Sequence, residues 1–179
     1  MELSLIAAAA QNRVIGSNGK IPWNIKADQE RFKELTAGNV VIMGKKTFDE
    51  IFSKLGRPLP ERINIVLTSD KNYFCEGAEF FSSLDEALSY SAEKYPEKKV
   101  FICGGQSLYE KALGLADKIY LTRIKLDVKG DRFFPEFNEC DFIITEEKTV
   151  EGEIPFTYFV YERKKNEEIN EKRKYLSNK

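Results

Sequence analysis

Residues 13–36 read R-V-I-G-S-N-G-K-I-P-W-N-I-K-A-D-Q-E-R-F-K-E-L-T, and the rest of the chain is organised around this stretch. Its first half is rich in Gly, Asn and Pro, which favour turn geometries, so we expect a loop there. Its second half predicts a helix that has Asn24 as its N-cap residue and ends near residues 36–38 at a glycine. A flexible loop is thus expected to lead directly into a helix.

The predicted helix carries a carboxylate on its apolar face. At about 100° per residue, Ile25, Asp28, Phe32 and Leu35 fall on one stripe. Asp28 can be a first-turn acid that complements the helix dipole, which is the interpretation that the stretch alone favours. It can also face a cleft, with the Gly-rich segment as a mobile lid above it. The rest of the chain has to decide between the two.

Composition narrows the class of protein. The chain has 179 residues, 42% of them hydrophobic, and a formal net charge of −1. These values predict one globular domain, without the positive net charge that would attract nucleic acid or acidic lipid. The sequence contains no histidine, which excludes His general bases, Ser-His triads and His-ligated metals. Cys75, Cys103 and Cys140 form no C-x-x-C pair, so neither a disulfide framework nor a zinc site is indicated, and we expect no metal.

The chain starts M-E-L-S-L-I-A-A-A-A, which lacks the basic region of a signal peptide. We interpret residues 3–10 as a buried first strand of a cytoplasmic protein, and no run approaches transmembrane length. Further strands are expected at residues 40–43, 63–67, 78–81, 99–103 and 118–124, with helices at 48–54, 82–88 and 106–113. Two alternating segments, 142–148 and 157–163, predict a final antiparallel hairpin. Strands alternating with helices indicate an α/β fold.

Two glycine-containing segments follow buried strands. Gly44-Lys45-Lys46-Thr47 places a glycine, two lysines and a hydroxyl at a helix start, which makes a natural anion site. The spacing is too short for a P-loop, and lysines in such a pair are more often a solvated surface pair. The Gly104-Gly105 pair lets backbone approach a ligand closely, although it is not the G-x-G-x-x-G fingerprint.

In this order, the segments resemble dihydrofolate reductase from nearly the first residue to about Arg163. The resemblance rests on motifs in register: S-L-I-A-A-A-A-Q-N-R-V-I-G, I-P-W followed by Asp28, V-I-M-G-K-K-T-F, G-R-P-L-P-E-R, V-L-T-S, I-C-G-G-Q-S-L-Y, Y-L-T-R-I and G-D-R-F-F-P. It implies an α/β fold with an eight-stranded, mostly parallel central sheet, flanking helices and a C-terminal antiparallel hairpin. One domain would span residues 1–163, with an adenosine-binding part at about 40–106, and residues 164–179 would be a charged tail.

The activity that the resemblance implies is NADPH-dependent reduction of 7,8-dihydrofolate to 5,6,7,8-tetrahydrofolate, with hydride transfer to C6 and protonation at N5. Such an enzyme supports one-carbon metabolism and the synthesis of thymidylate, purines and glycine. The implied partners are dihydrofolate and antifolate inhibitors, with no nucleic acid and no membrane, and we expect a monomer.

The resemblance also assigns roles to residues. Asp28 would accept hydrogen bonds from the amino group and the ring N–H of the pterin, a task that suits a carboxylate. Trp23 would hold an ordered water and pack the lid, and Thr122 would hydrogen-bond Asp28; these three are the expected catalytic group. Arg62 would bind the substrate's glutamate α-carboxylate with its bidentate fork. The complete predicted substrate site is Ile6, Ala8, Asp28, Phe32, Leu59, Arg62, Cys103 and Thr122.

The predicted cofactor site collects the glycine-containing segments and the ends of two strands. Lys45, Lys46 and Ser69 would recognise the 2′-phosphate, and the Gly104–Gly105 peptide would be cis, as in the family. The full set is Ala8, Ile15, Gly16, Gly44, Lys45, Lys46, Thr47, Leu67, Thr68, Ser69, Cys103, Gly104, Gly105, Gln106, Ser107 and Leu108.

Some residues depart from the family pattern. Gln29 replaces an apolar residue beside the acid, and Lys45 and Ser107 stand where arginines can occur. Residues 52–55 are an insertion relative to the shorter bacterial members. Two rival functions stay open at this point: a reductase of riboflavin synthesis on the same fold, and a ligand-binding module without catalysis.

Overall fold

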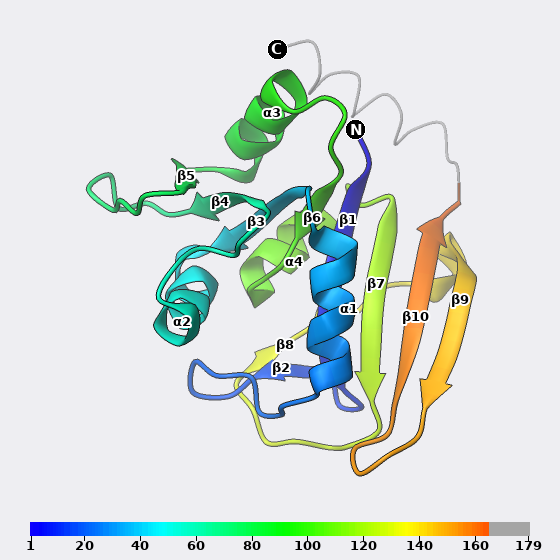
Figure 1. Ribbon diagram of the computed structural model, residues 1–179. Helices are drawn as coiled ribbons and strands as arrows, with labels where there is room; N and C mark the ends of the chain where they lie inside the picture. Colours follow the sequence, from blue (N-terminus) through cyan, green and yellow to red (C-terminus); the bar gives the residue numbers. More distant parts are fainter. Residues whose placement is uncertain (165–179) are drawn as a thin grey trace.

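The computed structural model describes residues 1–164, which form an α/β fold around one large sheet (Figure 1). Its strands are β1 (Leu3–Ala10), β3 (Val40–Gly44), β4 (Ile63–Leu67), β5 (Ala78–Phe81), β6 (Val100–Ile102), β7 (Lys118–Ile124), β9 (Phe142–Val150) and β10 (Phe156–Arg163). The helices are α1 (Lys26–Thr36), α2 (Lys45–Leu55), α3 (Leu84–Lys94), α4 (Gln106–Leu113) and the short 3₁₀ helix η1 (Glu139–Asp141). A separate two-stranded sheet joins β2 (Val14–Gly16) to β8 (Arg132–Phe133).

The eight strands lie in the order β5-β4-β3-β6-β1-β7-β10-β9. All neighbouring pairs from β5 to β7 are parallel, and only β10 runs in the opposite direction, pairing antiparallel with both β7 and β9. The predicted fold class is therefore confirmed. The antiparallel hairpin closes one edge of a sheet whose centre, β3, β6 and β1, consists of continuous apolar runs, as expected for parallel strands buried on both faces.

Alternate side chains of the central strands divide the core between the two faces of the sheet. Val40 and Ile42 of β3 pack in one cluster with residues of α3 and α4. Val41 and Met43, one residue out of phase, pack in a second cluster with residues of α1 and α2. Because side chains alternate across a strand, α3 and α4 cover one face, while α1 and α2 cover the other.

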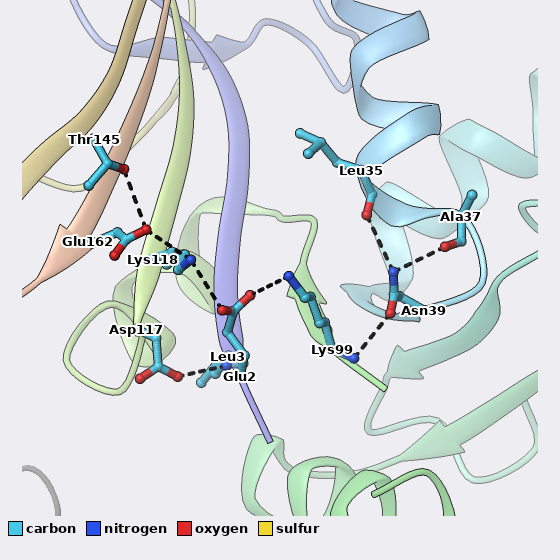
Figure 2. A network of polar contacts seen from close by, with 10 residues as sticks. All are labelled: Glu2, Leu3, Leu35, Ala37, Asn39, Lys99, Asp117, Lys118, Thr145 and Glu162. Atoms are coloured by element: carbon cyan, nitrogen blue, oxygen red, sulfur yellow. Dashed lines mark hydrogen bonds and ion pairs between the residues drawn. The ribbon is translucent and has the colours of Figure 1, made fainter. Parts of the chain in front are cut away.

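A polar network ties the strands together where the parallel strands begin (Figure 2). The Glu2 carboxylate lies 3.2 Å from Nζ of Lys99 and 3.3 Å from Nζ of Lys118. Lys118 also lies 2.9 Å from Oε1 of Glu162, a contact that raises the pKa of Lys118. Asn39 accepts a hydrogen bond from the Lys99 backbone N–H at 3.1 Å. These contacts join β1, β6 and β7 at their amino ends to β10 near its carboxyl end, because β10 runs in the opposite direction.

Three local predictions differ from the structure. Asn24 is not the N-cap of α1: the helix begins at Lys26 after Ile25, and the Asn24 side chain instead accepts a hydrogen bond from Nε2 of Gln29 at 2.8 Å. Helix α2 begins at Lys45, three residues earlier than predicted, because lysine is a good helix former and Gly44 serves as N-cap.

The third difference is β8, which was not among the predicted strands and pairs with β2. Helix α3 is capped by Ser83, whose side chain accepts a hydrogen bond from the Glu86 backbone N–H at 3.2 Å. Residues 165–179, most of the predicted charged tail, lie outside the described residues. Within residues 1–164, no helix is long and apolar enough to cross a membrane.

Candidate active site

Several of the predicted site residues lie at the carboxyl ends of four neighbouring parallel strands, whereas Arg62 precedes β4 and lies at its amino end. Ala8 of β1 is paired with Thr122 of β7, Gly44 ends β3, and Gly104 follows β6. In open α/β sheets, ligands bind outside this edge, because loops and helix N-termini converge there. Sheet topology therefore brings together residues that are far apart in the sequence.

Asp28 points from α1 toward β7. Its Oδ1 accepts a hydrogen bond from the Thr122 hydroxyl at 2.5 Å, and Thr122 is buried. Burial raises the pKa of Asp28, against the opposing influence of the Thr122 hydrogen bond and the positive charge of Arg31. A desolvated carboxylate that already holds one donor is poised to accept further hydrogen bonds from a ligand.

Arg31 lies one helical turn beyond Asp28, on α1, and the sequence did not single it out. Its Nη1 lies 2.9 Å from Oε1 of Glu146, and its guanidinium lies 4.2 Å from the ring centroid of Tyr158. These contacts connect α1 to β9 and β10. They depend on the placement of the hairpin, which helical periodicity cannot reveal.

Four of the apolar residues predicted to line the substrate site pack in one cluster. Ile6, Phe32, Leu59 and Cys103 all belong to the cluster on the α1 and α2 face of the sheet. Burial raises the pKa of the Cys103 thiol far above its ordinary value, so it behaves as an apolar group. The predicted residues Ala8 and Trp23 lie instead in a smaller cluster around Ile25, Ile124, Phe156 and Tyr158.

Arg62 is held in one orientation by three acceptors. Its Nε donates to Oγ1 of Thr36 at 3.1 Å, its Nη1 to the carbonyl of Pro60 at 2.5 Å, and its Nη2 to the carbonyl of Lys33 at 3.2 Å. A guanidinium has five N–H donors, so one on each Nη remains for another acceptor. That pair of donors matches the two oxygens of a carboxylate.

The Gly104–Gly105 peptide bond is cis, and Gly104 has a φ of +112°. A Cβ atom on Gly104 would lie 3.3 Å from Oη of Tyr109, a hydroxyl that donates to the carbonyl of Ile6 at 2.7 Å. The Gly44 backbone N–H donates to the Gly104 carbonyl at 2.8 Å. Glycine is thus required at position 104, which is buried, while the neighbouring Gly105 is partly exposed at this edge of the sheet.

The Gly-rich segment before Trp23 is anchored on two sides. The Gly16 carbonyl accepts from the Asp131 backbone N–H at 3.1 Å, and the Asp131 carboxylate accepts from the Asn18 N–H at 3.2 Å. On the other side, the Ile21 backbone N–H donates to Oε1 of Glu50 on α2 at 3.3 Å. The segment therefore connects the β8 loop with α2, as a lid across the site would.

The two lysines differ in their surroundings. Lys46 is exposed, whereas Nζ of Lys45 lies 2.7 Å from Oδ2 of Asp49 and 4.3 Å from the ring centroid of Tyr73. Thr68 and Ser69 follow β4, the neighbour of β3, so they lie at the same edge of the sheet as Lys45. Asp49 and Tyr73 were not predicted, because neither belongs to a recognisable motif.

The remaining predicted residues vary in exposure. Leu108 is buried in the core and its backbone N–H already donates to the Gly105 carbonyl at 3.0 Å. Ser107 is exposed, while Gln106 accepts a hydrogen bond from the Phe133 backbone N–H at 3.0 Å. Gln29 is exposed as well, so its amide lies at the outer side of α1. Partly buried positions complete the set: Ile15, Gly16, Thr47, Leu67 and Gly105.

Comparison with known proteins gives one consistent result. The family model described as dihydrofolate reductase matches residues 2–163. Dihydrofolate reductase of Bacillus subtilis (strain 168) is 39% identical over 166 residues, which cover 90% of this chain and 95% of the relative. Dihydrofolate reductase HdrB of Haloferax volcanii is 37% identical over 163 residues, which cover 89% of this chain and 82% of the relative.

A solved structure agrees with these relatives. It is described as dihydrofolate reductase from Enterococcus faecalis complexed with NADP(H) and RAB-propyl. It matches with a TM-score of 0.83 and 34% sequence identity, and the match covers 92% of this chain and 97% of that chain.

Proposed function

This chain belongs to the dihydrofolate reductase family, and we propose that it reduces 7,8-dihydrofolate to 5,6,7,8-tetrahydrofolate with NADPH. The observation that carries the proposal is the partly buried Asp28 carboxylate, hydrogen-bonded to the buried Thr122 beside an apolar cluster. A pterin needs a flat apolar surface for its rings and an acceptor for its amino group and adjacent N–H. Asp28 and the wall around Phe32 supply both.

We propose that Asp28 orients the pterin and promotes protonation at N5. As an anion held by Thr122, it accepts hydrogen bonds from the amino group and ring N–H, and thereby favours the protonated, more electrophilic substrate. The proton reaches N5 through a water beside the lid, which Trp23 packs and orders. No histidine is present in the sequence, so Asp28 is the side chain assigned to proton chemistry.

The residues at the carboxyl edge of the sheet fit a dinucleotide. Gly105 presents partly exposed backbone without a side chain at this edge, and Lys45 and Lys46 provide positive charge. NADPH, when bound, supplies the hydride that is transferred to C6 of dihydrofolate. Lys45, Lys46 and Ser69 are assigned to the 2′-phosphate, and the glycine pair with Ala8 and Ile15 to the nicotinamide side.

Arg62 is assigned to the α-carboxylate of the substrate's glutamate. Its guanidinium is already oriented by Thr36, Pro60 and Lys33, so little side-chain entropy is lost when the two remaining donors bind a carboxylate. The apolar wall would bind the aminobenzoyl ring that lies between pterin and glutamate. Antifolates with the same shape would occupy this site.

We further propose that residues 1–163 act as one monomeric domain, with an adenosine-binding part at about residues 40–106. All the assigned residues come from a single chain, so no partner is needed to complete the site. The product would supply one-carbon units for thymidylate, purine and glycine synthesis.

The test is NADPH oxidation measured with saturating dihydrofolate. Turnover that methotrexate inhibits is expected, whereas turnover only with a ribosylated pyrimidine would indicate the riboflavin-type reductase. Binding of dihydrofolate without any turnover would indicate a binding module. Full activity of Asp28→Asn at neutral pH would leave the reaction in place but remove the role assigned to Asp28.

A further inference from the structure

An acidic side chain lies against the lysine that the proposed function assigns to the 2′-phosphate. On α2, Asp49 follows Lys45 by one helical turn, and its Oδ2 lies 2.7 Å from Nζ of Lys45. Both side chains are partly exposed, at 37% for Lys45 and 43% for Asp49. The positive charge of Lys45 is therefore already paired before any phosphate binds.

Tyr73 holds this ion pair in place. Its hydroxyl donates to Oδ1 of Asp49, so each carboxylate oxygen has its own partner. The ring of Tyr73 lies under the Lys45 ammonium and packs edge-on against Phe48 and Phe80, with centroid distances of 6.3 Å and 5.4 Å. The aromatic cluster fixes Tyr73, which in turn fixes Asp49 next to Lys45.

These contacts influence the charge states of Asp49 and Tyr73. The Lys45 and Tyr73 hydrogen bonds hold the pKa of Asp49 below its usual value, despite the opposing influence of burial. Burial and the Asp49 contact raise the pKa of Tyr73 to about 12. At neutral pH the cluster thus contains an ammonium, a carboxylate and a neutral phenol, with no net charge.

We propose that Asp49 is a specificity-determining residue for the cofactor, which weakens the preference for a 2′-phosphorylated nucleotide by competing for Lys45. This inference rests on the proposed cofactor role of Lys45. Asp49 acts through Lys45 and by repulsion, and it does not contact the reacting atoms.

The sign of the effect follows from the charges. A 2′-phosphate brings close to two negative charges toward a carboxylate that Tyr73 prevents from turning away. It must also take over an ammonium that has a partner already. Neither cost arises for a nucleotide with a free 2′-hydroxyl, such as NADH. Because exposed ion pairs are weak, the phosphate can still bind, but with lower affinity than two unpaired lysines would provide.

The experiment measures dissociation constants at equilibrium for two matched pairs of ligands: NADPH against NADH, and 2′,5′-ADP against 5′-AMP. Asp49→Asn keeps the shape and removes the charge. We expect it to lower the dissociation constants of NADPH and 2′,5′-ADP about five- to tenfold at low salt, and to change those of NADH and 5′-AMP less than about twofold. The gain should shrink at high salt, because the groups are partly exposed.

Tyr73→Phe is the matched second variant, because it keeps the ring and removes only the hydroxyl that anchors Asp49. It should give a smaller gain in the same direction, about two- to threefold. Thermal unfolding of the unliganded variants shows whether either change disturbs the fold.

Each outcome separates this inference from the proposed function. If Asp49→Asn weakens the binding of NADPH, then Asp49 orients Lys45 for the phosphate, and the proposal is overturned. Equal changes for the phosphorylated and unphosphorylated ligands, or no change at all, overturn it too. If Lys45→Ala has no effect on NADPH relative to NADH, the cofactor role of Lys45 fails, and that result does not depend on Asp49.

Discussion

Replacing Thr122 by valine tests how the Asp28 carboxylate is maintained. Valine is β-branched and nearly isosteric, so β7 should retain its structure, but the hydroxyl that donates to Oδ1 of Asp28 is lost. Thr122 is buried and Asp28 partly buried, so no water is expected to replace the lost donor fully. A hydrogen bond to a charged group contributes about 1.5–3 kcal/mol, and we expect that loss in the free energy of unfolding while Asp28 is ionised.

The loss should depend on pH in a defined direction. The folded-state pKa of Asp28 is raised above 3.8, so the carboxyl group favours folding when protonated, and this contribution is lost as pH rises through the folded-state pKa. The Thr122 hydrogen bond opposes that rise, and Thr122→Val removes the opposition. The variant should therefore lose more stability at about pH 8 than at about pH 4.5, where more of the carboxyl is protonated.

Urea unfolding of both proteins at these two pH values provides the measurement, with the acidic limb of kcat/KM as a second readout. Thr122→Ser is the control, because it keeps the hydroxyl and loses only a methyl group, at a cost of about 0.5–1.5 kcal/mol that does not vary with pH. In an Asp28→Asn background, the cost of Thr122→Val should fall to about 1 kcal/mol or less. A loss that is the same at both pH values, or the same for serine and valine, would refute the reasoning.

Three further predictions follow from the same geometry. Asp28→Asn should lower kcat/KM at least about a hundredfold. It should also make the unliganded protein more stable at about pH 8, because a partly desolvated charge is removed. Urea unfolding should show that this gain in stability vanishes as pH falls toward 3.8. Arg62→Lys should raise KM for dihydrofolate about tenfold but leave KM for dihydropteroate, which lacks the glutamate, nearly unchanged; equal increases would contradict its role. Gly130→Ala should cost about 1–3 kcal/mol and slow turnover, because its Cβ would lie 2.3 Å from Cγ1 of Val14 and 2.6 Å from the Gly16 carbonyl oxygen; unaltered stability and turnover would show that the lid tolerates the displacement.

Much of the fold could be predicted from local sequence. The buried strands at residues 40–43 and 63–67 are short, continuous and rich in β-branched residues, a composition that few other structures accommodate. The stripe of Ile25, Asp28 and Phe32 predicts which side of α1 faces the protein. Where local preference is weak, prediction was less accurate: Asn24 does not cap α1, and α2 begins at Lys45.

The candidate site could be predicted only in part. Asp28, the lysine pair and the glycine pair have local signals, because each follows from periodicity or from backbone requirements. Asp49 and Tyr73 have none. They meet across 24 residues, and their contact depends on how the loop after β4 folds back onto α2.

The sequence by itself determined the α/β class, the apolar strands and the presence of an acid on the inner face of α1, because these depend on neighbours within a few residues. Only the tertiary structure decided what that acid meets. Thr122 is 94 residues away from Asp28, and the two are brought together because β7 pairs with β1 in a register that places Thr122 opposite Ala8. Strand order and register are determined by the packing of the whole core. The contact with Thr122, which distinguishes Asp28 from an ordinary acid in the first turn of a helix, therefore exists only in the folded chain.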